Sequence, residues 1–312
     1  MPLQNEKSTR NYTKITRVYT NSSDREEGGG LYSYRIKLLN ELQYVTGVEL
    51  TSYNLPNEIS PSFIAENGSF PGTNMVDFYL WDDDSDYSEH FSVEFPQKKY
   101  VYSDSFDETN SYIDTLADLM GVAISTSLVF GDAGPFNLRW NPYVDAANKT
   151  VLGLNTVNNV RWGFTFASGP NSANTAAYVM GFELADYDSD YNDATTVIYN
   201  SITSPNATVL NPYRYVDVSL EEARELSPLA RIYVTSDPFY GITQNEINVS
   251  RTRLLSSEPV RILRYLTITL TLEGGRPPPT SSGALPHDLG FTIFSLANEE
   301  TVPDWLNQAF VL

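Results

Sequence analysis

The sequence has no cysteine and only two histidines among its 312 residues. The lack of cysteine excludes disulfides, thiolate metal sites and cysteine nucleophiles, and it fits folding in a reducing compartment. The two imidazoles, His90 and His287, lie beside a strand start and a proline turn, and no G-x-S-x-G motif accompanies them. We expect both to make local hydrogen bonds, so the sequence predicts no catalytic residue and no cofactor.

Positive charge and long apolar runs are scarce as well. Lys and Arg total 20 against 39 Asp and Glu, a formal charge of −19. Phosphate backbones and anionic membranes repel such a chain, so we expect no direct nucleic-acid partner. No apolar run approaches the roughly 20 residues that span a bilayer, and the first residues, MPLQNEKSTRNYTK, lack the apolar centre of a signal peptide. We expect no membrane span and synthesis in the cytosol.

Strand-forming residues are plentiful by contrast, with 13% aromatic residues and 21 tyrosines. Between residues 91 and 182, four short segments separated by turn-rich residues have the composition of strands: FSVEF, FNLRW, TVLGLN and RWGFTF. After the first of them, SYIDTLADLMGVA places Ile113, Leu116, Met120 and Ala123 on one face of a helix. The pattern predicts an all-β sandwich of the jelly-roll type with one short inserted helix.

The clearest strand signal comes late in the chain, in VRILRYLTITLTLEGG. Its apolar positions alternate strictly with threonines, so we expect one face in the core and the other toward solvent or a neighbouring subunit. The apolar side chains are Leu266, Ile268, Leu270 and Leu272. The interface candidates are Thr267, Thr269 and Thr271.

We expect three parts along the chain. Residues 1–30 are polar and end in EEGGG, which predicts a flexible N-terminal arm. Residues 31–300 form one elaborated jelly-roll domain, because the last strands are needed to complete the first sheet. Residues 301–312 form a C-terminal arm with Phe310, Val311 and Leu312 as apolar anchors at a neighbour. The alternative is a division into two domains within the polar, turn-rich residues 183–212.

Two acidic clusters are the only candidates for a metal site. They are WDDDSDYSE and DYDSDYND, and in the second Asp186, Asp188 and Asp190 offer the oxygen ligands that calcium prefers. The EF-hand pattern fails there, because Tyr191 replaces the turn glycine and Val197 the closing glutamate. We interpret both clusters as solvated acidic loops and expect calcium to leave the melting temperature unchanged.

The order of features resembles jelly-roll minor capsid and penton proteins of large icosahedral double-stranded DNA viruses of the nucleocytoplasmic type. The resemblance covers residues 31–296 and depends on the combination of motifs rather than on any one of them. These motifs are LTSYNLPNEI, FSVEF, YIDTLADLM, FNLRW, LGL, WGFTFASGP, AAYVMGF, VRILRYLTITLTLEGGRPPP and LPHDLGFTIF.

The resemblance implies a structural, non-enzymatic virion protein made in the host cytoplasm. As a minor capsid component it would cap or cement the major capsid lattice through subunit contacts. Its partners would be the major capsid protein and other minor capsid proteins, with a homopentamer if it is the penton. Two alternatives stay open: a surface-exposed attachment module that binds a host glycan or receptor, and a hydrolase, for which the acidic pairs are the only support.

Overall fold

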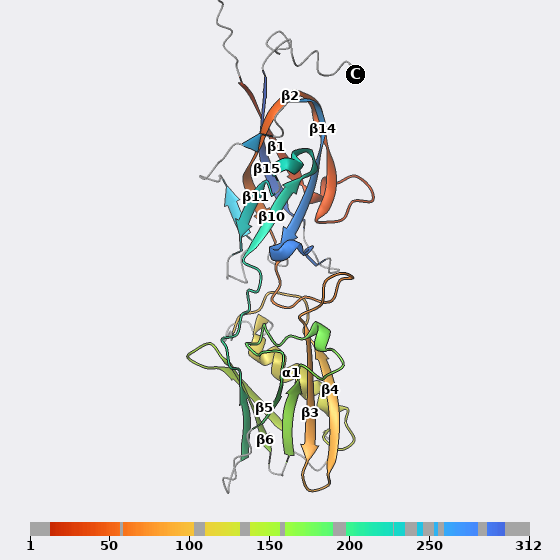
Figure 1. Ribbon diagram of the computed structural model, residues 1–312, viewed down its shortest axis with the longest axis vertical. Helices are drawn as coiled ribbons and strands as arrows, with labels where there is room; N and C mark the ends of the chain where they lie inside the picture. The colour runs from red at the N-terminus through yellow and green to blue at the C-terminus, as the bar shows by residue number, and fades with distance from the viewer. Residues whose placement is uncertain are drawn as a thin grey trace, which may run out of the picture. The chain divides into compact units, whose positions relative to one another are not determined.

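The computed structural model describes residues 13–56, 59–102, 110–131, 138–156, 160–189, 198–226, 228–234, 242–245, 253–254, 259–279 and 286–296. The chain folds into two compact units (Figure 1). Unit 1 takes its described residues from the ranges 1–56, 214–235 and 240–312, and unit 2 from 57–213. Both units consist of antiparallel sheets, and α1 is the only α-helix within the described residues.

Unit 1 is built around one long strand, β2 (Ser33–Leu55), which pairs with four other strands. Its first half pairs with β14 (Val260–Leu272), and its second half with β15 (Asp288–Leu296). On the β14 side the sheet continues through β10 (Tyr215–Leu220) to β11 (Ala230–Tyr233). On the β15 side it ends at β1 (Thr13–Asn21), and β12 (Ile242–Asn245) and β13 (Arg253–Leu254) pair with the second half of β2. Short 3-10 turns lie at Ser22–Asp24, Glu221–Leu226 and Glu273–Gly275.

The period-2 pattern of β14 sets the core of unit 1. Leu266, Ile268, Leu270 and Leu272 are all buried, whereas the three threonines between them are partly exposed. Across the sheet, Leu272 and Leu270 lie opposite the buried Val216 and Val218 of β10. A slip by one residue would turn every apolar side chain outward, which fixes the register of this strand. The predicted strand and its two faces are confirmed.

Unit 2 contains the predicted central segments in sequence order. One sheet has the order β4-β3-β7-β8, and a second sheet the order β5-β6-β9. The bounds of these strands are β3 (Met75–Asp82), β4 (Tyr87–Glu94), β5 (Arg139–Val144), β6 (Thr150–Thr156), β7 (Val160–Thr165), β8 (Asp186–Asp188) and β9 (Ile198–Thr203). A 3-10 turn lies at Ser172–Asn174.

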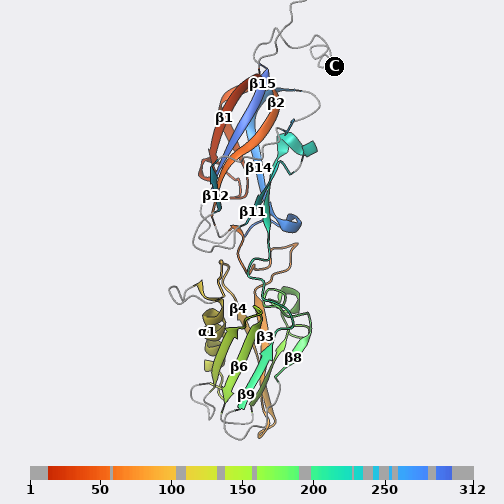
Figure 2. The same cartoon turned by 90° about the vertical axis from the view of Figure 1, so that its left-hand side faces the viewer.

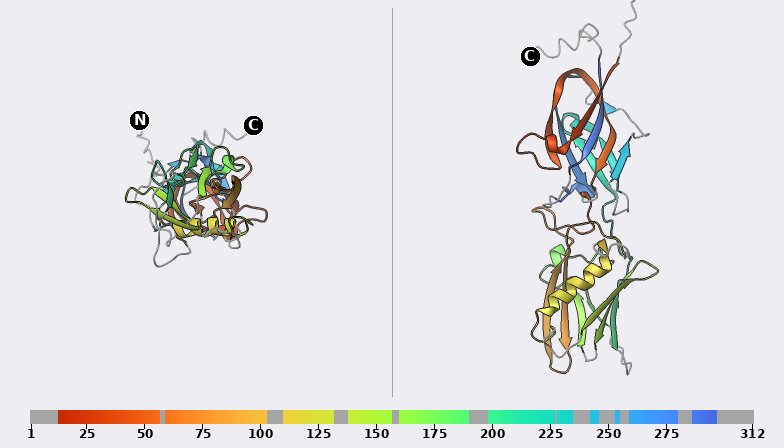
Figure 3. Two further views of the ribbon diagram at one scale, coloured as in Figure 1. Left: turned by 90° about the horizontal axis from the view of Figure 1, so that it is seen from below. Right: turned by 180° about the vertical axis from the view of Figure 1, so that it is seen from behind.

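The single α-helix, α1 (Tyr112–Ser125), packs on unit 2 as its sequence predicts. The Ser111 hydroxyl caps it by accepting a hydrogen bond of 3.2 Å from the Asp114 amide. Its buried side chains include Ile113, Leu116 and Met120. The helix lies beside β4 and β5 (Figure 3). Aromatic rings pack against the first residue of the helix, Tyr112. Two of them, Phe63 and Phe95, stack on each other with centroids 4.0 Å apart.

The predicted fold class, an all-β jelly-roll-type sandwich with one inserted helix, is confirmed. The domain organisation differs from the expectation in two respects. The last strands do complete the first sheet, as expected, but residues 57–213 form a separate unit between them. The expected arm at residues 1–30 contains β1, which pairs with β15 over nine residues. Five of these nine residues are β-branched, which favours a strand in spite of the charges. The expected arm at residues 301–312, with its anchors Phe310, Val311 and Leu312, lies outside the described residues.

Candidate subunit-contact surface

The three threonines predicted as interface residues lie together on the partly exposed face of the sheet formed by β2, β14, β10 and β11. The register places Thr267 opposite Arg35, Thr269 between Ser33 and Ser219, and Thr271 opposite Asp217. Residues that share a face of a sheet in this way are direct neighbours. We call this surface the threonine face and define it by residues Ser33, Arg35, Arg214, Tyr215, Asp217, Ser219, Arg231, Tyr233, Tyr265, Thr267, Thr269, Thr271 and Glu273.

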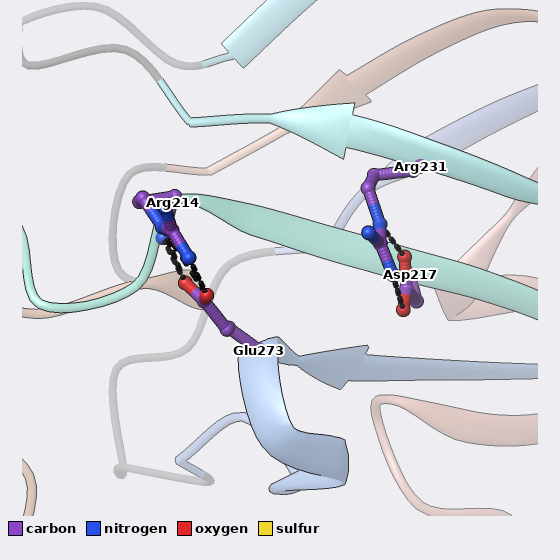
Figure 4. A network of polar contacts seen from close by, with 4 residues as sticks. All are labelled: Arg214, Asp217, Arg231 and Glu273. Atoms are coloured by element: carbon purple, nitrogen blue, oxygen red, sulfur yellow. Dashed lines mark hydrogen bonds and ion pairs between the residues drawn. The ribbon is translucent and has the colours of Figure 1, made fainter.

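A bidentate ion pair joins two strands of the threonine face. The Nε and Nη2 atoms of Arg231 donate to the two carboxylate oxygens of Asp217 at 2.8 and 3.0 Å (Figure 4). The same guanidinium lies 3.6 Å from the centre of the Tyr215 ring. Hydrogen bonding to the Asp217 carboxylate raises the pKa of Arg231 above its ordinary value. The charge is therefore held in a fixed, planar geometry that suits recognition by a partner.

A second ion pair joins the start of β10 to the end of β14 in the same sheet. Arg214, just before β10, pairs with Glu273, just after β14, and its backbone amide donates to the same carboxylate at 3.1 Å (Figure 4). The hydrogen bonds from the Arg214 side chain and amide lower the pKa of Glu273. Because the pair is exposed, we expect it to add little to folding stability and to act mainly by ordering the surface.

The rest of the threonine face carries aromatic rings, hydroxyl groups and the guanidinium of Arg35. The Arg35 guanidinium lies 5.1 Å from the Tyr265 ring centre, and the hydroxyls of Ser33 and Thr269 are 3.4 Å apart. Tyr233 is 69% exposed and meets the Tyr215 ring edge-on at 6.4 Å. Tyrosine and arginine are enriched in protein–protein interfaces because they bring large contact area and directed hydrogen bonds.

The ladder between β14 and β10 ends at a side-chain cap. Beyond the pair Leu220–Ile268, the chain turns away and both carboxylate oxygens of Glu222 accept from the Thr267 amide at 3.0 Å. The cap satisfies a strand donor that would otherwise lack its partner. No local sequence pattern signals this contact, which joins residues 45 positions apart.

The second acidic cluster serves the structure of unit 2. Asp186 accepts from the amides of Ala167 and Ser168 at 2.9 and 3.1 Å. Its partial burial would raise its pKa, but the hydrogen bonds from Ser168 and Ala167 outweigh burial and lower it. Asp188 accepts from the Tyr79 hydroxyl at 2.6 Å. Asp190, the third calcium candidate, lies outside the described residues.

The first acidic cluster also has internal partners. Asp82 is buried and accepts from the Asp84 amide and the Ser85 hydroxyl, which shapes the β3–β4 turn. Asp83 forms an ion pair with Arg161 on β7, and Glu89 accepts from the Ser127 hydroxyl at 2.6 Å. In the described ranges, no group of three or more His, Cys, Asp or Glu side chains is arranged to hold a metal ion. The same residues contain no helix long and apolar enough to cross a membrane.

The two histidines occupy very different surroundings. His90 lies on β4 with its ring 5.9 Å from that of Tyr79. His287 is fully buried, and the Tyr34 hydroxyl lies 2.8 Å from its Nε2 atom. Its backbone amide donates to the Ser22 hydroxyl at 3.0 Å, and its ring stacks on Tyr32. Burial lowers the pKa of His287 to about 4, which keeps it neutral in the folded protein.

No family model and no curated protein matches the chain. Among solved structures, the mavirus penton protein is similar with a TM-score of 0.44 at 11% identity, over 90% of this chain and 99% of the penton chain. A chain of the Sputnik virophage, solved by cryo-electron microscopy, is similar with a TM-score of 0.42 at 12% identity, over 91% of this chain and 98% of that one. The chain is thus similar, over nine tenths of its length, to chains from two viruses.

Proposed function

We propose that this chain is a structural, non-enzymatic protein of a viral capsid, and that the threonine face is one of its contacts with other shell subunits. The observation that carries the proposal is the construction of that face. Each of its two guanidinium–carboxylate pairs involves both carboxylate oxygens. Tyr233 is exposed, Tyr215 and Tyr265 are partly exposed, and none of the residues of the face is a histidine or a cysteine. Such a surface is organised before binding, so association costs little side-chain entropy.

The proposal agrees with the order of sequence features described above and gives the chain the kind of role stated by the name of one similar structure, a penton protein. The finer role is to cap or cement the major capsid lattice within the virion. The partners in this proposal are the major capsid protein, other minor capsid proteins and further copies of this chain.

The test is fractionation of particles purified from infected cells. A shell component copurifies with particles and resists release by mild detergent or salt, because many contacts hold it in the lattice. Release into the soluble fraction under these conditions would overturn the proposal. As a control, a soluble internal protein of the same particle is measured in the same fractions. Its retention shows that the shells stayed closed.

A second function, attachment to a host glycan or receptor, is favoured by a different observation in unit 2. Tyr143 and Tyr178 are 51% and 63% exposed, and exposed tyrosine suits sugar stacking and hydrogen bonding. Antibody access separates the two functions. An attachment module is labelled on intact particles, whereas a contact within the shell is labelled only after disruption.

A further inference from the structure

The two edge strands of the unit 1 sheet, β11 and β1, differ in how well they are protected against the addition of another strand. At one end, β11 has four residues and its Arg231 side chain is tied to Asp217 on β10. At the other end, β1 has nine residues, contains no proline and pairs with β15 in an unbroken register (Figure 2). Among the described strands, β15 is the only one that pairs with β1. A long, regular edge strand of this kind is a template for addition of another strand.

The side chains of β1 give the edge a chemical character. Ile15 and Tyr19 are 61% and 74% exposed on the outer face, where Arg17 lies between them. Tyr19 lies over Gly290 of β15, and a Cβ at that glycine would approach the Tyr19 ring to 3.1 Å. Within the described residues, Arg17 and Lys14 form no ion pair. The strand thus presents two cations and two apolar side chains, and no acid, in a chain with a formal charge of −19.

One segment of the same chain has the complementary character. Residues 297–312, which follow β15, carry Glu299, Glu300 and Asp304 and no Lys or Arg. After Pro303 they run DWLNQAFVL, nine residues without a further proline, which matches the nine residues of β1. The opposite segment, residues 1–12, is a poorer match because its charges, Glu6, Lys7 and Arg10, sum to +1.

We propose that the β1 edge receives residues 304–312 of a second copy of this chain as an added strand. This inference rests on the proposed shell function and names the partner of one contact within it. Lys14 and Arg17 would attract Asp304 and the two acids that precede the incoming segment, Glu299 and Glu300. Ile15 and Tyr19 would pack against the apolar side chains of the segment.

The topology favours a segment from another copy over the chain's own. β15 ends at Leu296, opposite Thr13 at the start of β1. To reach the outer edge of β1, the chain's own segment would have to pass around the end of β1 and run parallel to it. A segment from another copy can also run antiparallel, which is the slightly more stable pairing per residue. Sixteen extended residues span roughly 50 Å, which is enough to reach a neighbouring subunit.

A cysteine-free chain allows a direct test by disulfide formation between two full-length chains. One chain carries Tyr19→Cys, and a size-tagged chain carries a cysteine at Asn307, Gln308 or Ala309 in turn, which covers both faces of the incoming strand. The matched control replaces Tyr19→Cys by Tyr233→Cys, at the protected end of the same sheet and with similar exposure, 69%. For at least one tail position, the mixed disulfide should form about tenfold faster with Tyr19→Cys than with the control.

Charge reversal supplies a second, independent measurement. Arg17→Glu should slow the mixed disulfide about tenfold, and Asp304→Arg in the tagged chain should restore it. Equal rates for Tyr19→Cys and Tyr233→Cys at all three tail positions would overturn the proposal. A disulfide that closes only within a chain carrying both cysteines would overturn the second-copy assignment. Normal incorporation into particles of a chain that ends at Leu296 would remove this inference and leave the proposed shell function standing.

Discussion

The hydrophobic cores of the two units differ in the side chains that fill them and in the chain segments that form them. The core of unit 2 is aromatic: Trp162, Phe164, Phe166 and Phe182 form a chain of ring contacts at 4.7–5.3 Å. The core of unit 1 is aliphatic and comes from segments far apart in sequence, as in the contact between Thr20 and Leu289 across 269 residues. The described residues of unit 2 come from one continuous segment, 57–213. Unit 1 depends on both ends of the chain, and its exposed sheet surfaces carry the proposed contacts.

The largest expected effect is on unit 1 and comes from Ile268→Asp. The substitution buries an unpaired charge among aliphatic side chains and should cost several kcal/mol of unfolding free energy. We expect protease digestion of unit 1 in the soluble fraction, while residues 57–213 stay resistant as a separate unit. Wild-type protease resistance in unit 1 would show that β14 does not form its core. Simultaneous digestion of unit 2 would show that the two units fold as one.

Removal of a ring from the aromatic core of unit 2 should lower the stability of this unit strongly. Trp162 is fully buried and meets Trp140 edge-on with centroids 5.1 Å apart. Trp162→Ala should lower the free energy of unfolding by about 3–5 kcal/mol in urea denaturation, because it leaves a large cavity. The matched control is Tyr143→Ala, an exposed ring on β5, with an expected change within about 0.5 kcal/mol. Similar losses for both variants would contradict the assignment of Trp162 to the core.

The pH dependence of unit 1 should be traceable to His287. Its pKa is about 4 in the folded protein against an ordinary value of 6.5, so protons bind preferentially to the unfolded chain. Stability should therefore fall as the pH is lowered from about 6.5 to 4, by an amount on the order of 3 kcal/mol. In urea unfolding at pH 7 and pH 4.5, His287→Gln should lose this part of the pH dependence. Equal slopes with pH in both proteins would exclude His287 as the cause.

The smallest effect on folding is expected on the threonine face. Thr269→Asp places a charge on a partly exposed surface, so the free energy of unfolding should change by at most about 1 kcal/mol. The same charge should reduce incorporation into particles, because it would be desolvated in a subunit contact. The measurement compares the melting temperature with the amount of variant in purified particles. Wild-type incorporation would remove Thr269 from the contact surface.

The sequence predicted the parts of the fold that depend on local pattern. The helix with Ile113 and Leu116, strands β4 to β7 of unit 2 and the two faces of β14 follow from local composition and periodicity. Strands β8 and β9 were not predicted, because they lie within residues 183–212, which are polar and rich in turn residues. A division into two units was given only as an alternative, within residues 183–212, and it did not place residues 1–56 with residues 214–312. That arrangement depends on pairing between β15 and β1, which no local signal specifies. The ion pairs of Arg214 and Arg231 were missed for the same reason: they depend on strand register, and Arg231 is 14 residues from its partner.

The most direct test of the account is the copy number of this protein in purified particles, measured by quantitative mass spectrometry against the major capsid protein. A structural shell protein occupies symmetry-related positions, so the number should be constant between preparations and unchanged by mild detergent and salt. A value of about sixty, one pentamer at each vertex, would assign it to the penton position. A copy number that varies between preparations, or that falls to background after these washes, would contradict a structural role in the shell.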